Sequence, residues 1–252
     1  IQARIKKAAK GLKVNSDKIC LEVLNTLPHE GVLETRKLDS QIANIAAAHT
    51  GTHHDYSRLA SSVSVSSYHK ETSSSFTETM KVLHEDGVVH DHMLEIIEEY
   101  GAAKIDAIID DSRDYNFDYF AWKTLQDMYL LKNAKGIPYE RPQQMYLRVA
   151  LWVTNSLKEA KEYYESLSKQ LISPATPIMI NAGTVVPQLA SCVLEYNSGD
   201  SGDGLLQTFA DVSKYSSAGA GIGLCMSNIR SKESRIKSSG GYAMGLLKYL
   251  KI

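Results

Sequence analysis

Three widely spaced cysteines are the side chains of this sequence best suited to redox chemistry. They are Cys20, Cys192 and Cys225, and no CxxC pair occurs. An odd number of separate cysteines is typical of a reducing compartment, where a cysteine is free, buried or catalytic, rather than of a secreted disulfide framework. We therefore expect a cytoplasmic protein.

Cys192 lies in the run ASCVL at 190–194, at the start of a predicted strand. A cysteine in such a position is usually a small core residue. A redox role needs a partner thiol, and the sequence identifies none. The pattern therefore favours the core for Cys192, with a redox role as the alternative, and the core for Cys20 and Cys225.

The glycine-rich run GAGIG at 219–223 could contact a ligand. A Rossmann fingerprint follows a strand and opens a helix, so that the helix N-terminus meets the pyrophosphate. Here a predicted helix precedes the glycines and a predicted strand follows them, which excludes that interpretation. The glycines instead permit a tight turn and a close approach of backbone to ligand.

A basic segment follows this predicted strand, with Arg230, Lys232, Arg235 and Lys237 interrupted by Glu233. A cationic loop that ends in glycines can bind phosphate. It can equally be a solvated loop, and the residue pattern alone favours the solvated loop.

His90 and His92 are separated by one residue, a spacing that suggests a metal motif. Alternating residues share a face only on a strand, whereas this stretch resembles a helix start. No third ligand is evident nearby. We therefore expect a helix-capping role and no metal site in this chain.

The overall composition is that of an ordinary globular protein. The 252 residues are 43% hydrophobic and 23% charged, with a net charge of -1. This balance gives no reason to expect a nucleic acid or a membrane surface as partner. The sequence contains no run of eighteen apolar residues and no signal peptide.

Helical periodicity predicts the elements of the first two thirds of the chain. Apolar residues recur at helical spacing over 1–12, 16–24 (with Ser16 or Asp17 as cap), 37–48, 54–68, 80–83, 93–97, 141–153 and 157–171, with a turn at 135–138. We expect short loops between these helices, since no low-complexity tract interrupts them.

The pattern changes at Ser173. Pro174 and Pro177 restrict the backbone around them, and short apolar runs bounded by glycine follow at 178–180, 192–196 and 222–226. A helix is predicted over 205–217, between the last two runs. Strand, helix and strand at this spacing predict the start of an α/β sheet or barrel, so the fold class is α+β to α/β.

Several segments, taken in order, match a known family. They are YHKET at 68–72, RDY at 113–115, KTL at 123–125, ERPQQM at 140–145, SPATP at 173–177, NAGT at 181–184, PQLASC at 187–192, GDS at 199–201, GAGIG at 219–223 and the pair Ile229-Arg230. Together they resemble the large subunit of class I ribonucleotide reductases, which convert ribonucleoside diphosphates into deoxyribonucleotides. The resemblance covers essentially the whole chain. It is specific because all these segments occur together and in order, whereas any one of them alone would be weak.

The resemblance implies a substrate site. Cys192 matches the cysteine that reduces the substrate radical and forms a disulfide with a second cysteine further along the chain. Thr176 and Ser191 match residues that hold the substrate diphosphate and ribose, and Gly221 matches a glycine close to the substrate.

The resemblance also implies two allosteric sites. Asp200, Ser201 and Arg230 match the specificity site, where a deoxynucleoside triphosphate effector binds, and 231–239 corresponds to its flexible loop, which would report across a dimer interface. Gly202 and Ser217 replace side chains that some relatives use there, so effector preference could differ. The ATP/dATP contacts of the family's ATP-cone domain match Thr35, Asp39 and Lys70.

The domain organisation implied by the resemblance is an ATP-cone-like domain at 1–72 without its opening hairpin, a helical segment at 73–172, and the first strands of a ten-stranded α/β barrel at 173–252. The sequence begins and ends inside structural patterns, and the family's thiyl-radical cysteine would follow Ile252. We therefore expect a fragment that is inactive alone.

The expected partners are a ribonucleoside diphosphate, a metal-containing small subunit that supplies the radical, thioredoxin or glutaredoxin as reductant, and a second large subunit in a homodimer. No covalently bound cofactor is expected. One alternative is the nucleotide-binding half of a naturally split subunit that needs a second chain. An adenosylcobalamin-dependent reductase is less favoured, because 113–145 and the region of Lys70 resemble class I.

Overall fold

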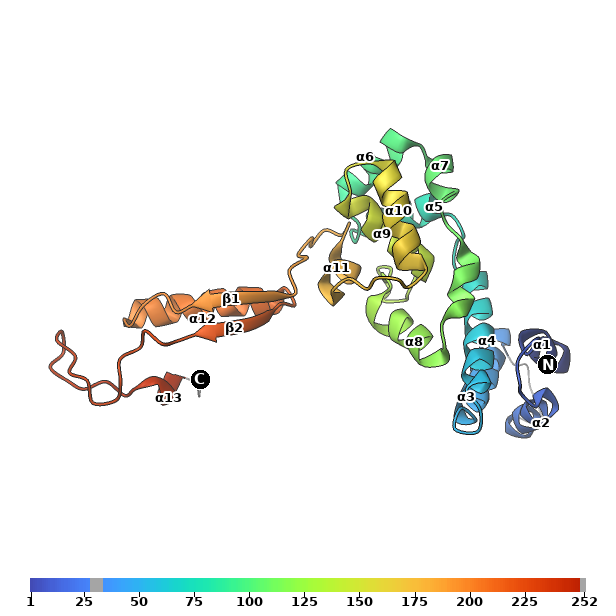
Figure 1. Ribbon diagram of the computed structural model, residues 1–252, viewed down its shortest axis with the longest axis horizontal. Coiled ribbons are helices and arrows are strands. Elements are labelled where there is room, and N and C mark those ends of the chain that lie inside the picture. The colour runs from blue at the N-terminus through green and yellow to red at the C-terminus, as the bar shows by residue number, and fades with distance from the viewer. Residues whose placement is uncertain (28–33, 250–252) are drawn as a thin grey trace. The chain divides into compact units, whose positions relative to one another are not determined.

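The structure is a computed structural model that describes residues 1–27 and 34–249 and divides into two compact units. The helical unit comprises residues 1–174 and 179–187, and the βαβ unit comprises residues 175–178 and 188–252. Figure 1 traces the elements of each unit along the chain. The predicted domain boundaries at residues 72 and 172 remain predictions.

The first part of the helical unit consists of four helices at the predicted places. They are α1 (Gln2–Ala8), α2 (Ser16–Thr26), α3 (Thr35–Ala48) and α4 (Asp55–Glu71). Ile5, Ile19, Ile42 and Leu59, one from each helix, are fully buried in a shared core, as the helical periodicity predicts.

The predicted cap of α2, Ser16 or Asp17, is wrong by one or two residues. Asn15 is the N-cap, and its side chain accepts a hydrogen bond from the Lys18 amide at 2.9 Å. Asparagine is as good a cap as serine or aspartate, so the sequence alone did not single out the right one.

Further helices follow α4 in this unit. They are α5 (Phe76–Glu85), α6 (Asp91–Tyr100), α7 (Ala102–Asp106), the short helices η1 (Asp111–Asn116) and η2 (Leu125–Tyr129), α8 (Tyr119–Thr124), α9 (Pro142–Val153) and α10 (Leu157–Ser168). Residues 142–151 of α9 are all buried, including its polar ones. A helix buried on every side needs polar partners for its polar residues.

The predicted strand at 178–180 is wrong, because these residues belong to helix α11 (Thr176–Asn181). A short apolar run does not distinguish a strand from a buried helix. Pro177 is the second residue of α11, and proline is tolerated in the first turn of a helix. The chain then turns at Gly183, whose φ is +77°.

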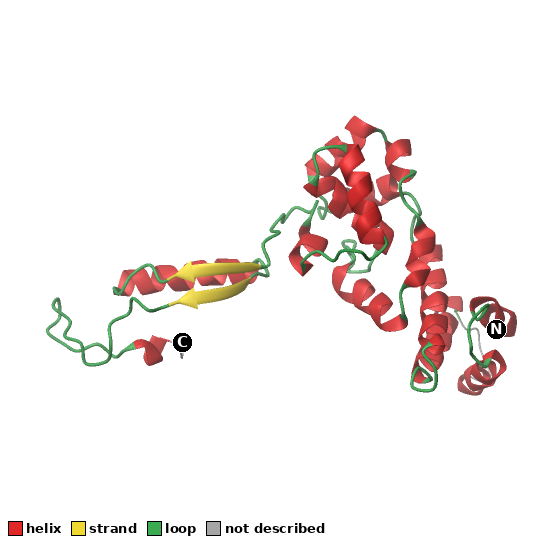
Figure 2. Ribbon diagram, in the orientation of Figure 1, coloured by secondary structure: helices red, strands yellow, loops and turns green. Residues whose placement is uncertain are grey.

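Strand, helix and strand form the βαβ unit, as predicted (Figure 2). β1 (Cys192–Tyr196) pairs in parallel with β2 (Gly221–Cys225), and Cys192 lies opposite Gly221. Helix α12 (Gly202–Ser217) connects the strands and packs on the sheet. A short helix, α13 (Leu246–Tyr249), follows. The ten-stranded barrel remains a prediction, since one two-stranded sheet is formed by the described residues.

Within residues 1–27 and 34–249, every helix is too short or too polar to cross a membrane. Residues 250–252, where we expect the structural pattern to be interrupted, lie outside the described residues.

Candidate functional site

The thiol of Cys192 lies on an open face of the sheet. Cys192 is the first residue of β1 and is exposed. Leu194 and Tyr196, which share its face, are 84% and 75% exposed. Residues of a strand alternate between faces, so α12 covers the opposite face and leaves the cysteine open.

Gly221 faces Cys192 across the strand pair and keeps its sulfur uncovered. A Cβ atom added at Gly221 would lie 3.8 Å from the Cys192 Sγ atom. The Gly221 amide donates to the Ser191 carbonyl oxygen at 2.8 Å. The structure thus brings together Ser191, Cys192 and Gly221, three of the residues predicted for the substrate site. The fourth, Thr176, is the exposed first residue of α11.

The pattern-based prediction of a core position is wrong for Cys192 and Cys225, whereas Cys20 is buried as predicted. Cys225 ends β2 on the same open face as Cys192 and is partly exposed. Its thiol lies 3.2 Å from the Ser227 hydroxyl, and hydrogen bonds from the Ser227 side chain and backbone lower the pKa of Cys225.

Cys192 and Cys225 are too far apart to form a disulfide in this sheet. The strand register places Cys225 opposite Tyr196, four residues beyond Cys192. Four residues of a strand span about 13 Å, more than the roughly 7 Å between Cα atoms that a disulfide permits.

Asp200, Ser201 and Arg230, predicted for a nucleotide site, also meet. The Arg230 Nε donates to the Asp200 carboxylate, and its second nitrogen donates to the Asp200 carbonyl oxygen at 3.3 Å. Ser201 is the N-cap of α12 and accepts from the Gly204 amide at 3.1 Å. The first turn of α12 thus starts beside the ion pair.

A cavity of about 780 Å³ opens at this point of the βαβ unit. Its lining includes Asp200, Ser201 and three cations, Arg230, Arg235 and Lys237. A helix N-terminus together with cations attracts phosphate. The volume falls within the range of small-molecule sites, which is roughly 300–1,000 Å³.

Sequence reasoning missed three further residues that line this cavity, Tyr242, Met244 and Tyr249. The Ile236 amide donates to the Gly241 carbonyl oxygen, and the Ala243 amide donates to the Ser234 carbonyl oxygen, both at 2.8 Å. This folding of the loop brings Tyr242 to the cavity. No residue spacing in the sequence predicts this folding of the loop.

The residues predicted for the ATP site lie at neighbouring ends of α3 and α4. Thr35 begins α3, and Asp39, one turn later, is buried and paired with Arg4 of α1. Lys70 is exposed in the last turn of α4. An ion pair of 3.6 Å between Arg36 and Glu71 shows that these two helix ends are adjacent.

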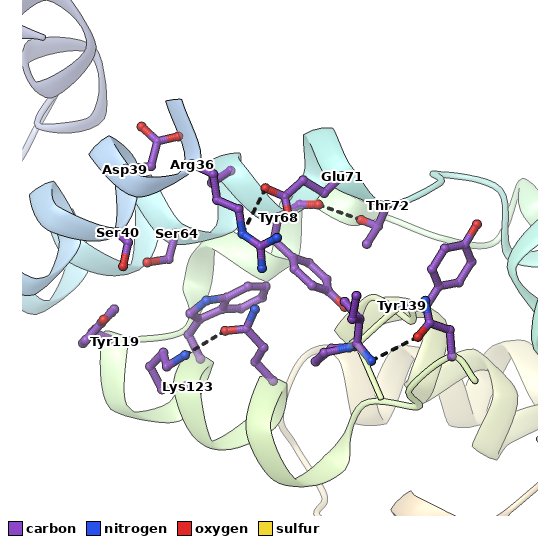
Figure 3. A pocket seen from close by; sticks show the side chains of 16 residues that line it. Arg36, Asp39, Ser40, Ser64, Tyr68, Glu71, Thr72, Tyr119, Lys123 and Tyr139 are labelled. Carbon is purple, nitrogen blue, oxygen red and sulfur yellow. Dashed lines mark hydrogen bonds and ion pairs between the residues drawn. The ribbon is translucent and has the colours of Figure 1, made fainter. Parts of the chain in front are cut away.

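Beside these ends lies a cavity of about 330 Å³, lined by α3, α4 and α8 (Figure 3). Asp39 and Trp122 both belong to its lining. Asp39 Oδ1 and Trp122 Nε1 are buried, and neither has a hydrogen-bond partner in the structure. The sequence did not predict this cavity, which depends on the packing of distant helices.

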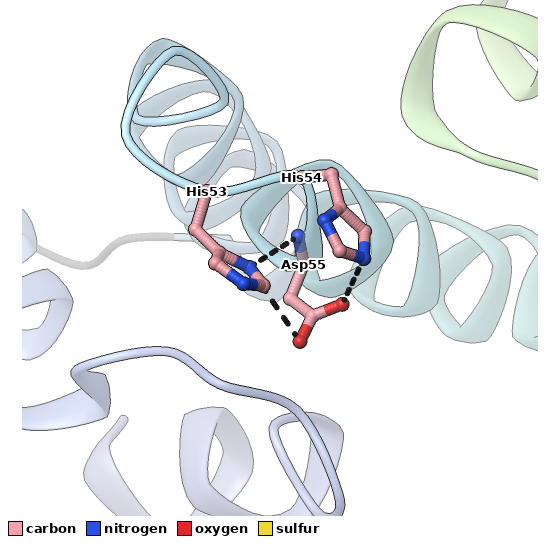
Figure 4. Close-up of side chains that lie close together, drawn as sticks. All are labelled: His53, His54 and Asp55. Atoms are coloured by element: carbon pink, nitrogen blue, oxygen red, sulfur yellow. Dashed lines mark hydrogen bonds and ion pairs between the residues drawn. The ribbon is translucent and has the colours of Figure 1, made fainter.

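A cluster of His53, His54 and Asp55 joins the α1–α2 loop to the start of α4 (Figure 4). Asp55 accepts a hydrogen bond from the Lys13 amide at 2.7 Å, and His54 Nε2 lies 3.1 Å from its other oxygen. The Lys13 amide is the main cause of the lowered pKa of Asp55.

The predicted capping role of the histidine pair at 90 and 92 is confirmed for His90. It is the N-cap of α6, and its Nδ1 atom accepts a hydrogen bond from the His92 amide at 3.1 Å. His92 Nδ1 lies 2.8 Å from Glu95 of the same helix.

A buried ion pair in the helical unit was also missed. Glu140 and Arg148 are fully buried and joined by contacts of 2.7 and 3.0 Å. Arg148 donates further to the carbonyl oxygens of Met179, at 3.0 Å, and Ala182. The sequence did offer one indication of this ion pair, namely Arg148 within the apolar run of α9.

Two family models match most of the second half of the chain. The all-alpha domain of ribonucleotide reductase matches residues 115–187, and the barrel domain of ribonucleotide reductase matches residues 190–252. The boundary between the two matches falls where the helical unit gives way to the βαβ unit.

Similar curated proteins include ribonucleoside-diphosphate reductase large subunits from three eukaryotes. The Arabidopsis thaliana protein is 35% identical over 100% of this chain and 32% of its own length. The Trypanosoma brucei brucei protein is 37% identical over 88% of this chain and 28% of its own length. The Caenorhabditis elegans protein is 36% identical over 100% of this chain and 33% of its own length. The chain spans about a third of the length of these relatives. By both family models and by these similarities, the chain belongs to the ribonucleotide reductase large-subunit family.

Proposed function

We propose that this chain forms the part of a ribonucleoside-diphosphate reductase large subunit that carries a substrate-reducing cysteine and an effector-nucleotide site. The observation that carries the proposal is the exposed Cys192 thiol on the open face of β1, opposite a glycine. A thiol that must reach a ribose needs such an uncovered position.

Cys192 would act as one of two thiols that reduce the ribose. In the larger protein, a thiyl radical would abstract the 3′ hydrogen and return it at the end of the reaction. In between, one of the two thiols would give a proton to the 2′-hydroxyl, which leaves as water, and the other would give its hydrogen to the 2′ carbon, so that the two sulfurs become a disulfide. The hydroxyl groups of Thr176 and Ser191 would bind the diphosphate and ribose. The disulfide is then reduced by exchange with thioredoxin or glutaredoxin.

A deoxynucleoside triphosphate would bind in the cavity of the βαβ unit. The Asp200 carboxylate is suited to accept from a ribose hydroxyl, and the Arg230 guanidinium to bind a phosphate. The two side chains pair with each other in this structure. Nucleotide binding would therefore divide this ion pair between sugar and phosphate.

The remaining parts of the proposal concern the larger protein. We expect a metal-containing small subunit as the radical source, a homodimer of large subunits, and a cytoplasmic location. ATP or dATP would bind near Thr35, Asp39 and Lys70, in an ATP-cone-like domain. Barrel strands beyond β2 would complete the site around Cys192.

Protection of Cys192 from alkylation tests the proposed substrate site. Cytidine diphosphate at saturating concentration should slow labelling of Cys192 by iodoacetamide and leave Cys225 labelling unchanged, with each site quantified by peptide mass spectrometry. A Cys192→Ser variant identifies the correct peptide. Equal labelling of Cys192 with and without the diphosphate would contradict the proposal.

A further inference from the structure

The side-chain amide of Asn197 is almost completely buried and fully hydrogen-bonded. Asn197 follows β1 directly and is 4% exposed. Its Nδ2 atom donates to the Gly199 carbonyl oxygen at 3.0 Å and to Asn228 Oδ1 at 2.9 Å. Its Oδ1 atom accepts from the Thr208 hydroxyl of α12 at 2.8 Å.

The backbone of Asn197 takes part in the same network. Its amide donates to the Cys225 carbonyl oxygen at 3.0 Å, and its carbonyl oxygen accepts from Asn228 Nδ2 at 2.8 Å. Thr208, 1% exposed, also accepts from the Ser198 amide at 3.0 Å. One residue thus connects the ends of both strands with α12.

The bonds to Gly199 and Asn228 end on the two segments that carry Asp200 and Arg230 to the nucleotide cavity. Gly199, held by the amide, precedes Asp200, and Asn228 lies two residues before Arg230. A Cβ atom at Gly204 would lie 2.8 Å from the Gly199 carbonyl oxygen, so the first turn of α12 rests directly on this loop.

We propose that Asn197 is a positioning residue of the effector-nucleotide site, fixing the backbone of the Asp200 and Arg230 segments relative to each other. This inference rests on the proposed function of the cavity. An apolar side chain of similar size could fill the space of Asn197 but could not donate to the two loops. Both N–H donors and the oxygen acceptor of the side-chain amide therefore serve to fix the positions of the two loops and of α12.

Two variants test the proposal without touching the cavity lining. Asn228→Ala removes both side-chain bonds to Asn197 at an exposed position, and Thr208→Val removes one hydroxyl at nearly constant volume. Ser213→Ala is the matched control, because the Ser213 hydroxyl, on the same helix, donates only to the Phe209 carbonyl oxygen. All are made in the full chain.

Two measurements separate positioning from stability. Titration calorimetry with dTTP should show affinity weakened about tenfold in Asn228→Ala and in Thr208→Val, the factor expected for the loss of about one net hydrogen bond, and unchanged in Ser213→Ala. Nuclear magnetic resonance of the Arg230 Nε–H group, assigned with Arg230→Lys, should show its signal shifted and broadened in both test variants, recorded well below the thermal midpoint of each so that every variant is folded.

The outcomes distinguish the two levels of the proposal. If Arg230→Met abolishes dTTP binding but both test variants bind like the parent, the positioning role is wrong and the site stands. If the parent itself does not bind dTTP, the proposed site is wrong, and the Arg230 signal still shows whether Asn197 orders the ion pair. An unchanged Arg230 signal in both variants overturns the positioning role.

Discussion

At position 221 the lack of a side chain leaves the Cys192 sulfur open. An added Cβ would touch Sγ at 3.8 Å, an ordinary contact, so alanine fits there. The two further methyl groups of a valine would extend over the open face of the strand pair, where the thiol lies.

We predict that Gly221→Val slows alkylation of Cys192 several-fold, while Gly221→Ala changes the rate little. The rate of iodoacetamide labelling, measured by mass spectrometry, checks both variants. Gly223→Ala is the control, because its Cβ would meet Leu194 at 2.8 Å and not the cysteine. Equal rates in all variants would show that Gly221 does not control access to the thiol.

Asp55 links stability to pH at the junction of the α1–α2 loop with α4. Its pKa is lowered in the fold, mainly by the Lys13 amide. A carboxyl with a lowered folded pKa stabilises the fold above its unfolded pKa, and this contribution is lost as the pH falls through the folded pKa. For aspartate this loss occurs below about pH 4.

We predict that Asp55→Asn lowers the thermal midpoint at pH 6. On acidification from pH 6 to pH 3, the thermal midpoint of the variant should fall by less than that of the parent. Circular dichroism melts at both values check this. Asp203→Asn, at an exposed aspartate of α12 for which the structure shows no side-chain partner, is the control. If the thermal midpoints of Asp55→Asn and the parent fell by the same amount between pH 6 and pH 3, Asp55 would not be a source of the pH dependence.

At the scale of elements, α9 organises the helical unit through polar contacts inside its core. Glu140, just before the helix, and Arg148 within it are fully buried. Arg148 also holds the carbonyl oxygens at the end of α11. Removing one member of a buried ion pair leaves an uncompensated charge, which costs about 3–5 kcal/mol.

We predict that Arg148→Met destabilises the chain by about that amount, and that adding Glu140→Leu recovers part of the loss. Recovery stays incomplete because the carbonyl oxygens of Met179 and Ala182 lose their donor, at about 1–3 kcal/mol. Urea unfolding measures each free energy. Arg113→Met, which breaks a partly exposed pair with Glu165, should cost less, and an equal cost would contradict the argument.

The predicted elements were right where periodicity was long, and the one predicted strand that proved to be a helix was a run of three residues. The helices from α1 to α4 and α9 and α10 follow apolar stripes over several turns, and β1, α12 and β2 follow from their glycine boundaries. The run at 178–180 is too short to show a period, and the helix there is held by Arg148, a contact distant in sequence.

At the scale of the whole chain, the two units differ in how completely they bury their cores. Residues 142–151 of α9 are all buried, whereas Leu194 and Tyr196 of β1 are largely exposed. Local opening is easier where few apolar contacts hold the backbone.

We predict that backbone amides of β1 and β2 exchange hydrogen much faster than those of α9. Exchange followed by mass spectrometry at neutral pH measures both sets in one experiment. The amides of α10, which packs against α9, should exchange at intermediate rates. Slower exchange in the strands than in α9 would show that the open face does not weaken the βαβ unit.

The sequence by itself determined the family, the helical and βαβ regions, and the residues that meet around Cys192 and between Asp200 and Arg230. The helical and βαβ regions follow from local periodicity and glycine boundaries, and the residues of the two sites follow from the resemblance to the family. Only the tertiary structure decided the exposure of Cys225, the buried Glu140–Arg148 pair, the Asn197 network and the walls of both cavities. Each depends on which face a strand turns to its helix, or on contacts between residues far apart in sequence, and local patterns carry no information about either.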